Sequence, residues 1–195
     1  MLEIGGTTLL TRMIRLLETH VSRIHVVIGY REELIIDHCS RYHPQVVLVR
    51  NPEFRTTNTG HSLALGASHL SGKCVFLDGD LVINPASLCA FLEHASLTDI
   101  LVGICQPNTE NAVFAEAEET AEGQTVMGFT REKTTPWEWA NVFAGPNTLM
   151  HGADNYVFEH LAKRLPLPGH MLELAEIDTI TDMREAELFI QKYGL

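Results

Sequence analysis

Hydrophobic residues in the first half of the chain switch repeatedly between helical and strand-like spacing. Leu9–Val21 repeats apolar residues at helical intervals, and Thr7 or Thr8 can cap its first turn. Arg23–Tyr30 instead holds a run of apolar residues without polar alternation, the pattern of a strand buried on both faces. Up to Asp80, the pattern predicts helices over Leu9–Val21, Glu32–Tyr42 and Thr59–Leu70 and strands over Arg23–Tyr30, Gln45–Arg50 and Val75–Leu77. This alternation indicates βαβ units with right-handed crossovers.

The second half of the chain predicts a change to antiparallel pairing. Asn111–Glu118 and Gln124–Arg131 mix polar and apolar residues and flank an acidic turn with a glycine, which indicates a hairpin. Leu165–Gly169 contains two prolines and is expected to be a break. The other predicted elements are helices from Pro85 to about His94, over Thr148–Arg164 and over Thr181–Tyr193, strands over Asp99–Cys105, Ala140–Ala144 and Met171–Ile177, and a loop over Thr134–Trp139.

Two carboxylates follow the apolar run Val75–Leu77 directly. Asp78 and Asp80 flank Gly79, and in open α/β sheets the carboxyl end of a strand is where ligands bind. Two hard oxygen ligands at that position suit Mg²⁺ with bound phosphates. Taken alone, the tripeptide is more typical of an ordinary turn, because Asp-Gly is a common turn dipeptide.

Composition restricts the classes of partner. The chain has 195 residues and a formal net charge of −11, which predicts a single domain and argues against nucleic acid or an anionic membrane as partner. Its four cysteines show no paired metal-ligand spacing, so reduced thiols and a cytoplasmic protein are expected. No apolar run approaches the length of a membrane span, and no signal sequence is visible.

Five motifs in order resemble a known enzyme family. They are Leu2–Gly6 followed by a helix, the run from Leu48 to Leu70, VFLDGD ending at Asp80, FTREK ending at Lys133, and EIDTITDMREAE starting at Glu176. Together they resemble the nucleotidyltransferases that join a nucleoside triphosphate to a sugar 1-phosphate, phosphocholine or a similar phosphate. The resemblance covers essentially the whole chain. It implies a Rossmann-like, three-layer α/β/α fold with a mostly parallel, mixed central sheet, as in nucleotide-diphospho-sugar transferases.

The resemblance assigns the reaction centre to three charged residues. Asp80 and Asp178 are the implied Mg²⁺ ligands, and Lys133 is the implied contact to the acceptor phosphate. Asp78 and Glu176 are auxiliary ligands or simple solvated acids. For Asp178 the alternative is an acid favoured by a helix N-terminus, and for Lys133 an exposed lysine after a hairpin, since the family's usual proline is here a threonine.

Two further groups are implied substrate contacts. Asn58, Thr59 and Ser62 match the segment beside the nucleotide base, although the same residues suit simple helix capping. On the acceptor side the resemblance implies Glu132, Trp137, Glu138 and Asn141. Trp137 and Trp139 flank Glu138, so this loop suits a cationic amine through cation–π attraction and charge. The alternative is that at least one tryptophan fills the edge of the core.

The sequence departs from the family at its start. Members normally begin with a buried strand, a glycine-rich phosphate-binding loop containing an arginine, and a Pro-Lys pair, none of which precedes Leu2–Gly6. We therefore expect an N-terminally truncated domain over residues 1–195, with low activity and with either low stability or self-association through an open sheet edge. Two functions remain open: a Mg²⁺-dependent nucleotidyltransferase domain that transfers NMP and releases pyrophosphate, or an inactive nucleotide-binding or regulatory domain.

Overall fold

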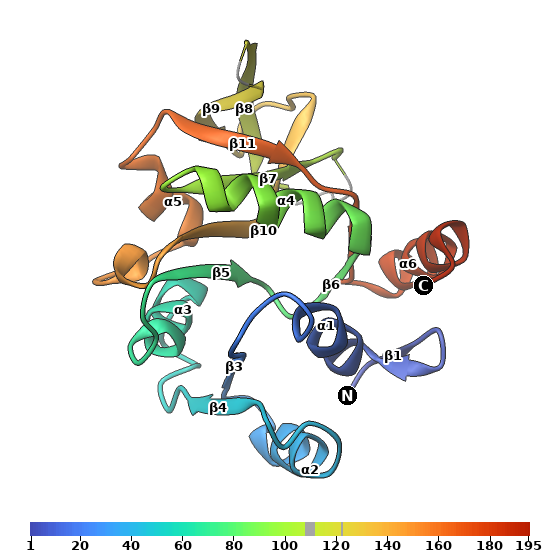
Figure 1. Ribbon diagram of the computed structural model, residues 1–195. Coiled ribbons are helices and arrows are strands. Elements are labelled where there is room, and N and C mark those ends of the chain that lie inside the picture. Colours follow the sequence, from blue (N-terminus) through green and yellow to red (C-terminus); the bar gives the residue numbers. More distant parts are fainter. Residues whose placement is uncertain (108–111, 122) are drawn as a thin grey trace.

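A six-stranded mixed sheet forms the centre of the protein (Figure 1), which is described by a computed structural model over residues 1–107, 112–121 and 123–195. The strands occur in the order β5-β10-β7-β11-β9-β8. They are β5 (Lys73–Leu77), β7 (Leu101–Cys105), β8 (Phe114–Thr120), β9 (Gly123–Thr130), β10 (Trp137–Pro146) and β11 (Leu167–Met171). Only β7 and β11 pair in parallel within this sheet. Because β10 also pairs with β8, the strands β10, β7, β11, β9 and β8 form a closed ring.

Three two-stranded ladders surround this sheet. The parallel ladder joins β3 (His25–Ile28) to β4 (Val47–Arg50) and lies apart from the sheet, below β5 in Figure 1. An antiparallel ladder joins β6 (Leu81–Ile83) to β12 (Leu174–Glu176). The third is the N-terminal hairpin of β1 (Glu3–Ile4) and β2 (Thr7–Thr8).

At the start of some helices, a side chain accepts a hydrogen bond from a free backbone N–H group. Thr8 accepts a hydrogen bond from the Thr11 amide, and Asn84 accepts one from the Ala86 amide. The helices are α1 (Leu9–Leu17), α2 (Glu32–Tyr42), α3 (Thr59–Ala67), α4 (Pro85–Leu97), a 3₁₀ turn (Asn147–Met150), α5 (Val157–Ala162) and α6 (Ile180–Tyr193). None of the helices in the described ranges has the length and apolar character that a bilayer crossing requires.

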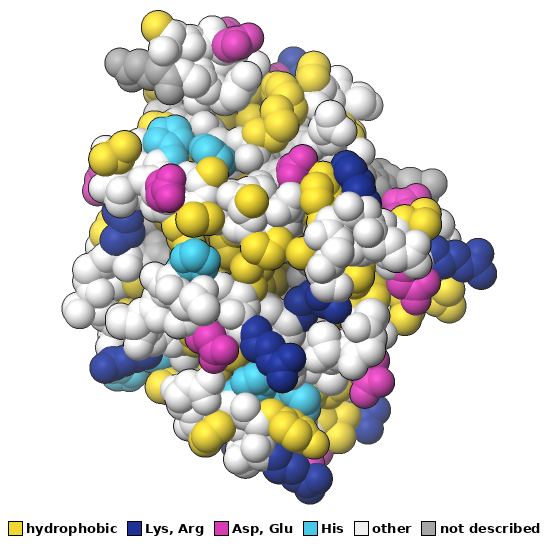
Figure 2. Space-filling view, turned by 45° about the vertical axis from the view of Figure 1, so that its right-hand side comes forward, with side chains coloured by type: hydrophobic (Ala, Val, Ile, Leu, Met, Phe, Trp, Pro, Cys, Tyr) yellow, Lys and Arg dark blue, Asp and Glu magenta, His cyan; other side chains and the backbone are white. Residues whose placement is uncertain are grey.

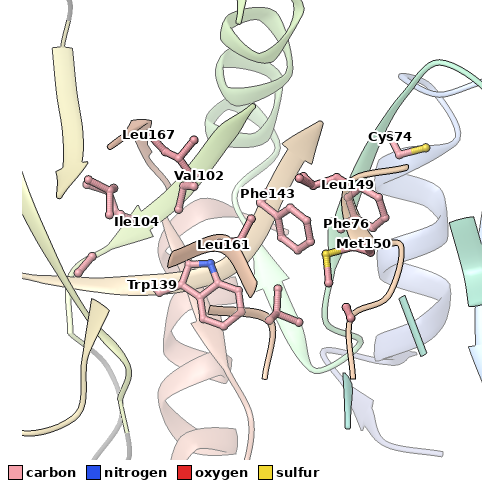
Figure 3. Close-up of a cluster of buried hydrophobic side chains, with 14 of the residues drawn as sticks. Cys74, Phe76, Val102, Ile104, Trp139, Phe143, Leu149, Met150, Leu161 and Leu167 are labelled. Atoms are coloured by element: carbon pink, nitrogen blue, oxygen red, sulfur yellow. The ribbon is translucent and has the colours of Figure 1, made fainter. Parts of the chain in front are cut away.

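Aromatic and branched side chains fill the interior beside β10 and β7 (Figure 3). Phe143 stacks on Phe76 with ring centroids 4.7 Å apart, and Trp139 lies in the same cluster. All five residues of β7 are buried. The core therefore holds β5, β10 and β7 together as one packed unit.

The structure confirms the α/β class and the mixed sheet but corrects several elements. β5 pairs antiparallel with β10, and it lies at the edge of its sheet instead of in a parallel sheet. The hairpin of β8 and β9 is confirmed as antiparallel; its predicted first residue, Asn111, lies outside the described residues. The predicted helix over Thr148–Arg164 is wrong: Gly152, at φ 71°, separates the 3₁₀ turn from α5, because that backbone conformation cannot continue a helix.

Tertiary pairing overrides three further local predictions. Trp137–Trp139, expected in a loop, belongs to β10 because its backbone pairs with β7 and β8. Leu167–Gly169, expected to be a break, belongs to β11, between β7 and β9, despite Pro168. The predicted strand over Met171–Ile177 divides between β11 and β12. The final helix is capped by Thr179, in a capping box with Asp182, and begins at Ile180, one residue before the predicted start.

Charged side chains of both signs are dispersed over the face shown in Figure 2. Hydrophobic side chains reach the surface in the middle of that face.

Candidate functional site

The β6–β12 ladder brings together acids that are far apart in the sequence. Asp80 immediately precedes β6, and Glu176 is the last residue of β12, opposite Leu81 in the register. The Ile177 amide donates to the Asp80 carbonyl at 3.1 Å, so Asp178 follows beside Asp80. Carboxylate oxygens of Asp80, Glu176 and Asp178 all lie within 4.8 Å of one another.

These acids have the character of a cation site. Oδ1 of Asp80 is buried and has no hydrogen-bond partner among the described residues, whereas buried polar atoms normally have one. Burial and the neighbouring Asp80 and Asp178 raise the pKa of Asp78 to about 7. Burial followed by the same two acids raises the pKa of Glu176 to about 8. A divalent cation held by three oxygen ligands would remove this repulsion, so the donor set fits Mg²⁺.

A bulge in β10 adds an amide to the cluster. The register of β10 with β7 shifts between Trp139 and Phe143, and Asn141 within it has φ 55°, a left-handed conformation in which Asn is enriched. Asn141 Nδ2 donates to Glu176 Oε1 at 3.1 Å, and the Asn141 carbonyl accepts from the Asp78 amide at 3.3 Å. The bulge therefore connects the acids at both ends of the site to the central sheet.

A small cavity of about 180 Å³ opens beside the acids. Arg131 supplies the positive charge in its lining and stands over two aromatic rings, 4.9 Å from the centroid of Tyr156 and 5.1 Å from that of Phe158. The other lining residues are Thr59, Asp78, Ala112, Val113, Glu138, Trp139, Asn141, Val157, Glu176 and Asp178. The cavity thus combines acids, one guanidinium and an aromatic wall.

The predicted nucleotide-base residues occupy the start of α3 at this site. Thr59 lines the cavity, and Asn58 precedes the helix without making a side-chain cap hydrogen bond. Ser62 accepts a hydrogen bond from Asn51 Nδ2 at 3.0 Å. Simple capping therefore does not explain Asn58.

The predicted acceptor residues divide between the cavity and other surroundings. Glu138 and Asn141 line the cavity, whereas Trp137 packs against the main core cluster. Lys133 and Glu132 are exposed, Lys133 forms an ion pair with Glu116, and neither lines the cavity. The roles predicted for Lys133, Glu132 and Trp137 stay predictions.

The cavity residues that were not identified from the sequence include Arg131, Tyr156 and Phe158. Arg131 lies within the FTREK motif, two positions before Lys133. Tyr156 and Phe158 carry no local signal, because they come from a segment that the hydrophobic pattern assigned to one long helix. Their contribution depends on the packing of α5 against β9.

Solved structures share this fold at low sequence identity. HddC from Yersinia pseudotuberculosis is similar with a TM-score of 0.77 and 16% identity, and the match covers 96% of this chain and 88% of that one. The inositol-1-phosphate CTP transferase from T. maritima is similar with a TM-score of 0.76 and 14% identity. That match covers 99% of this chain and 86% of the transferase. CTP:phosphocholine cytidylyltransferase (LicC) from Streptococcus pneumoniae is similar with a TM-score of 0.74 and 18% identity, over 96% of this chain and 87% of that one.

Sequence comparison identifies the family. The chain is 24% identical over 183 residues to the bifunctional protein GlmU of Methanococcus vannielii. The aligned region covers 90% of this chain but 40% of that relative. The chain thus spans less than half the length of this curated relative. The profile of the MobA-like NTP transferase domain matches residues 1–166. The chain therefore belongs to the MobA-like NTP transferase family.

Proposed function

We propose that this domain transfers a nucleoside monophosphate from a nucleoside triphosphate to a small phosphorylated acceptor in a Mg²⁺-dependent reaction. The observation that carries the proposal is the convergence of Asp80, Glu176 and Asp178 beside a cavity with one guanidinium. Names of structural relatives support it, since they include an inositol-1-phosphate CTP transferase and a phosphocholine cytidylyltransferase. In the proposed reaction an acceptor phosphate oxygen bonds to the α-phosphorus as the α–β anhydride bond breaks and pyrophosphate leaves.

Asp80 and Asp178 hold the cation in this proposal, with Glu176 as a third oxygen donor. Bound Mg²⁺ would neutralise phosphate charge in the transition state. Asn141 orients Glu176 through the 3.1 Å hydrogen bond, and the β6–β12 ladder fixes the position of Asp80. The side chains thus position reactants and provide charge, which is the main task of a protein in phosphoryl transfer.

The acceptor is proposed to enter the cavity beside Arg131. A guanidinium suits a phosphate because its planar donors match two oxygens. Glu138 and Trp139 lie on the cavity wall, so an acceptor with a cationic amine, phosphocholine or aminoethylphosphonate, fits better than a sugar 1-phosphate. Thr59, at the start of α3, faces the same space from the side proposed for the nucleotide, together with Asn58 and Ser62.

Metal binding and turnover test this proposal separately. Mn²⁺ binding is measured by electron paramagnetic resonance, and pyrophosphate release is measured with the four common triphosphates against the three acceptor types. Asp80→Asn should abolish Mn²⁺ binding and reduce any transfer by about 100-fold or more, because a ligand at the transferring phosphate is lost. Thermal unfolding should change little, since Asp80 repels its neighbours when no metal is bound.

Asp99→Asn is the matched control, because Asp99 is exposed and does not belong to the acid cluster. Its metal affinity should equal that of the unmodified chain. Metal and nucleotide binding without pyrophosphate release would favour the non-catalytic nucleotide-binding domain. Unchanged Mn²⁺ affinity in Asp80→Asn would overturn the metal site.

A further inference from the structure

Two histidines meet where helix α4 packs against strand β11. His94 lies in the last turn of α4, and His170 lies near the end of β11. Their Nδ1 atoms are 3.1 Å apart, and the two rings meet edge-on with centroids 5.3 Å apart. Because 76 positions separate the two residues in the sequence, only the packing of the helix on the sheet creates this pair.

The sheet side of the pair is held by a core residue. Phe91 lies one turn before His94 and is fully buried. Its ring meets the ring of His170 edge-on, with centroids 5.9 Å apart. Both histidines are half-buried, so their side chains are positioned by packing without being sealed from solvent. Such a pair loses little conformational entropy when it binds a ligand.

The electrostatics of the pair favour neutral imidazole. Burial, followed by the neighbouring His94, lowers the pKa of His170. The neutral ring is the form in which histidine binds metal ions, because a protonated nitrogen has no free lone pair. His170 is therefore available as a ligand at neutral pH.

The distance between the two nitrogens suits one shared ion. Two imidazole nitrogens bound to one ion at about 2.1 Å lie roughly 3.0 Å apart at a right angle and roughly 3.4 Å apart at the tetrahedral angle. The observed 3.1 Å falls between these values. A small rotation of each ring about its terminal side-chain torsion, which has a broad energy minimum, directs both lone pairs at the same point.

We propose that His94 and His170 bind a divalent transition-metal ion of the Zn²⁺, Ni²⁺ and Cu²⁺ class, at a site separate from the acid cluster. Imidazole suits these ions, whereas Mg²⁺ takes hard oxygen ligands. Within the part of the chain that the structure describes, no third His, Cys, Asp or Glu side chain joins the pair as a ligand. Water completes the coordination, so this site binds more weakly than a structural zinc site with four protein ligands.

The bound ion connects a helix to the central sheet. It holds the last turn of α4 on β11, and the two histidines are separated when the chain unfolds. An ion that binds the folded chain alone stabilises it in proportion to the logarithm of the ion concentration. The site therefore predicts a metal-dependent increase in stability that does not require the acid cluster.

A hydrogen bond between two neutral rings is the alternative explanation of the same distance. In that arrangement one Nδ1 donates to the other, and the proton occupies the position of the ion. A hydrogen bond gives no response to added metal. Metal titration therefore separates the two explanations.

The test measures thermal unfolding of the 195-residue chain with Zn²⁺, Ni²⁺ or Cu²⁺ in excess Mg²⁺. We expect the melting temperature to rise by about 5 °C or more when the ion is at about one hundred times its dissociation constant. Electron paramagnetic resonance of bound Cu²⁺ should show coupling to two nitrogens. His94→Gln and His170→Gln should each abolish both responses, because a single imidazole remains.

Each variant is compared with itself in the presence and absence of metal, so a change in its basal stability does not affect the readout. His20→Gln is the matched control, because His20 is exposed and lies outside this pair. It should keep both responses. An unchanged melting temperature with all three ions would leave the pair as a hydrogen bond and overturn the proposal, as would equal responses in His94→Gln and the unmodified chain.

Asp80→Asn separates this site from the acid cluster. The variant should keep the full response to Zn²⁺, Ni²⁺ and Cu²⁺, because Asp80 belongs to the acid cluster and not to the histidine pair. Loss of the response in Asp80→Asn would assign the ion to the acids and overturn the proposal. None of these readouts measures nucleotidyl transfer, so a failure of the proposed reaction leaves the result at the histidine pair unaffected.

Discussion

Strands β7 and β3 have similar apolar sequences but very different surroundings. All five residues of β7 are buried, and Val102 is 0% exposed. Only Ile28 is buried among the four residues of β3. β7 lies between β10 and β11, whereas β3 pairs with β4 alone among the residues that the structure describes. Apolar composition therefore creates a core only where neighbouring strands and helices are present to cover it.

The difference divides the molecule into a tight part and a loose part. The two largest clusters of buried side chains draw their members from the central sheet, the β6–β12 ladder and the helices around them. No residue of β3 or β4 is a buried member of either cluster. We expect the β3–β4 ladder to open more readily than the sheet, since local stability follows apolar contacts.

Matched valine truncations test this division most directly. Val102→Ala should cost about 2 kcal/mol, or roughly 4–8 °C in melting temperature, because it removes two buried methyl groups and leaves a void. Val27→Ala, in half-buried β3, should cost less than about half of this. Urea and thermal unfolding of both variants provide the comparison. Equal costs would show that β3 is as well packed as β7.

The acidic cluster should give the second largest effect, through pH. Asp78 and Glu176 have raised pKa values of about 7 and about 8, so the folded state binds protons that the unfolded state has released. The stability that this proton binding adds to the folded state is fully present below the pKa values of the unfolded chain, near 4. It is lost as the pH rises through 7 to 8. Without metal, we expect the melting temperature to be a few degrees lower at pH 8.5 than at pH 5.5.

Millimolar Mg²⁺ should remove most of this loss, because the cation replaces the protons. Glu176→Gln should flatten the same pH dependence without metal, while Glu93→Gln, on the exposed side of α4, should preserve it. A melting temperature that rises with pH in the metal-free protein would contradict the coupling of these acids.

The smallest effect is expected where α2 meets α1. His43 is buried, and its Nε2 lies 2.9 Å from Oγ1 of Thr11. Burial, followed by His38 and Arg15, lowers the pKa of His43. The stability that neutral His43 adds to the folded state is therefore present above the pKa of histidine in the unfolded chain, near 6.5, and is lost as the pH falls. His43→Gln keeps a polar partner for Thr11. The fall in melting temperature between pH 7 and pH 5 should be about 1–2 °C smaller in this variant.

The comparison variant for this prediction is His20→Gln, since His20 is exposed and lies outside this contact. Hydrogen exchange in α2 localises the effect. An identical pH response in both variants would exclude His43 as the source.

Local sequence signals identified part of the candidate site. Asp80 was predicted from its position after a strand-like apolar run and from the family resemblance, whereas Asp178 was predicted as its partner from the resemblance alone. The structure places carboxylate oxygens of the two residues within 4.8 Å of each other. Glu176 was expected only as an auxiliary acid, although it belongs to the same cluster. Arg131, Tyr156 and Phe158 could not be predicted as a group, because they meet only through the packing of α5 on the β8–β9 hairpin.

By itself the sequence determined the α/β class, the N-terminal alternation of helices and strands, and the pair of acids, Asp78 and Asp80, that follows the apolar run Val75–Leu77. These features depend on local periodicity, capping and turn chemistry, which each segment carries by itself. Tertiary structure alone decided that β5 is an edge strand, that Trp137 joins β10, and that an open groove lies beside β3. Strand pairing joins residues that are distant in the sequence, so no local pattern specifies which edges meet and which remain open.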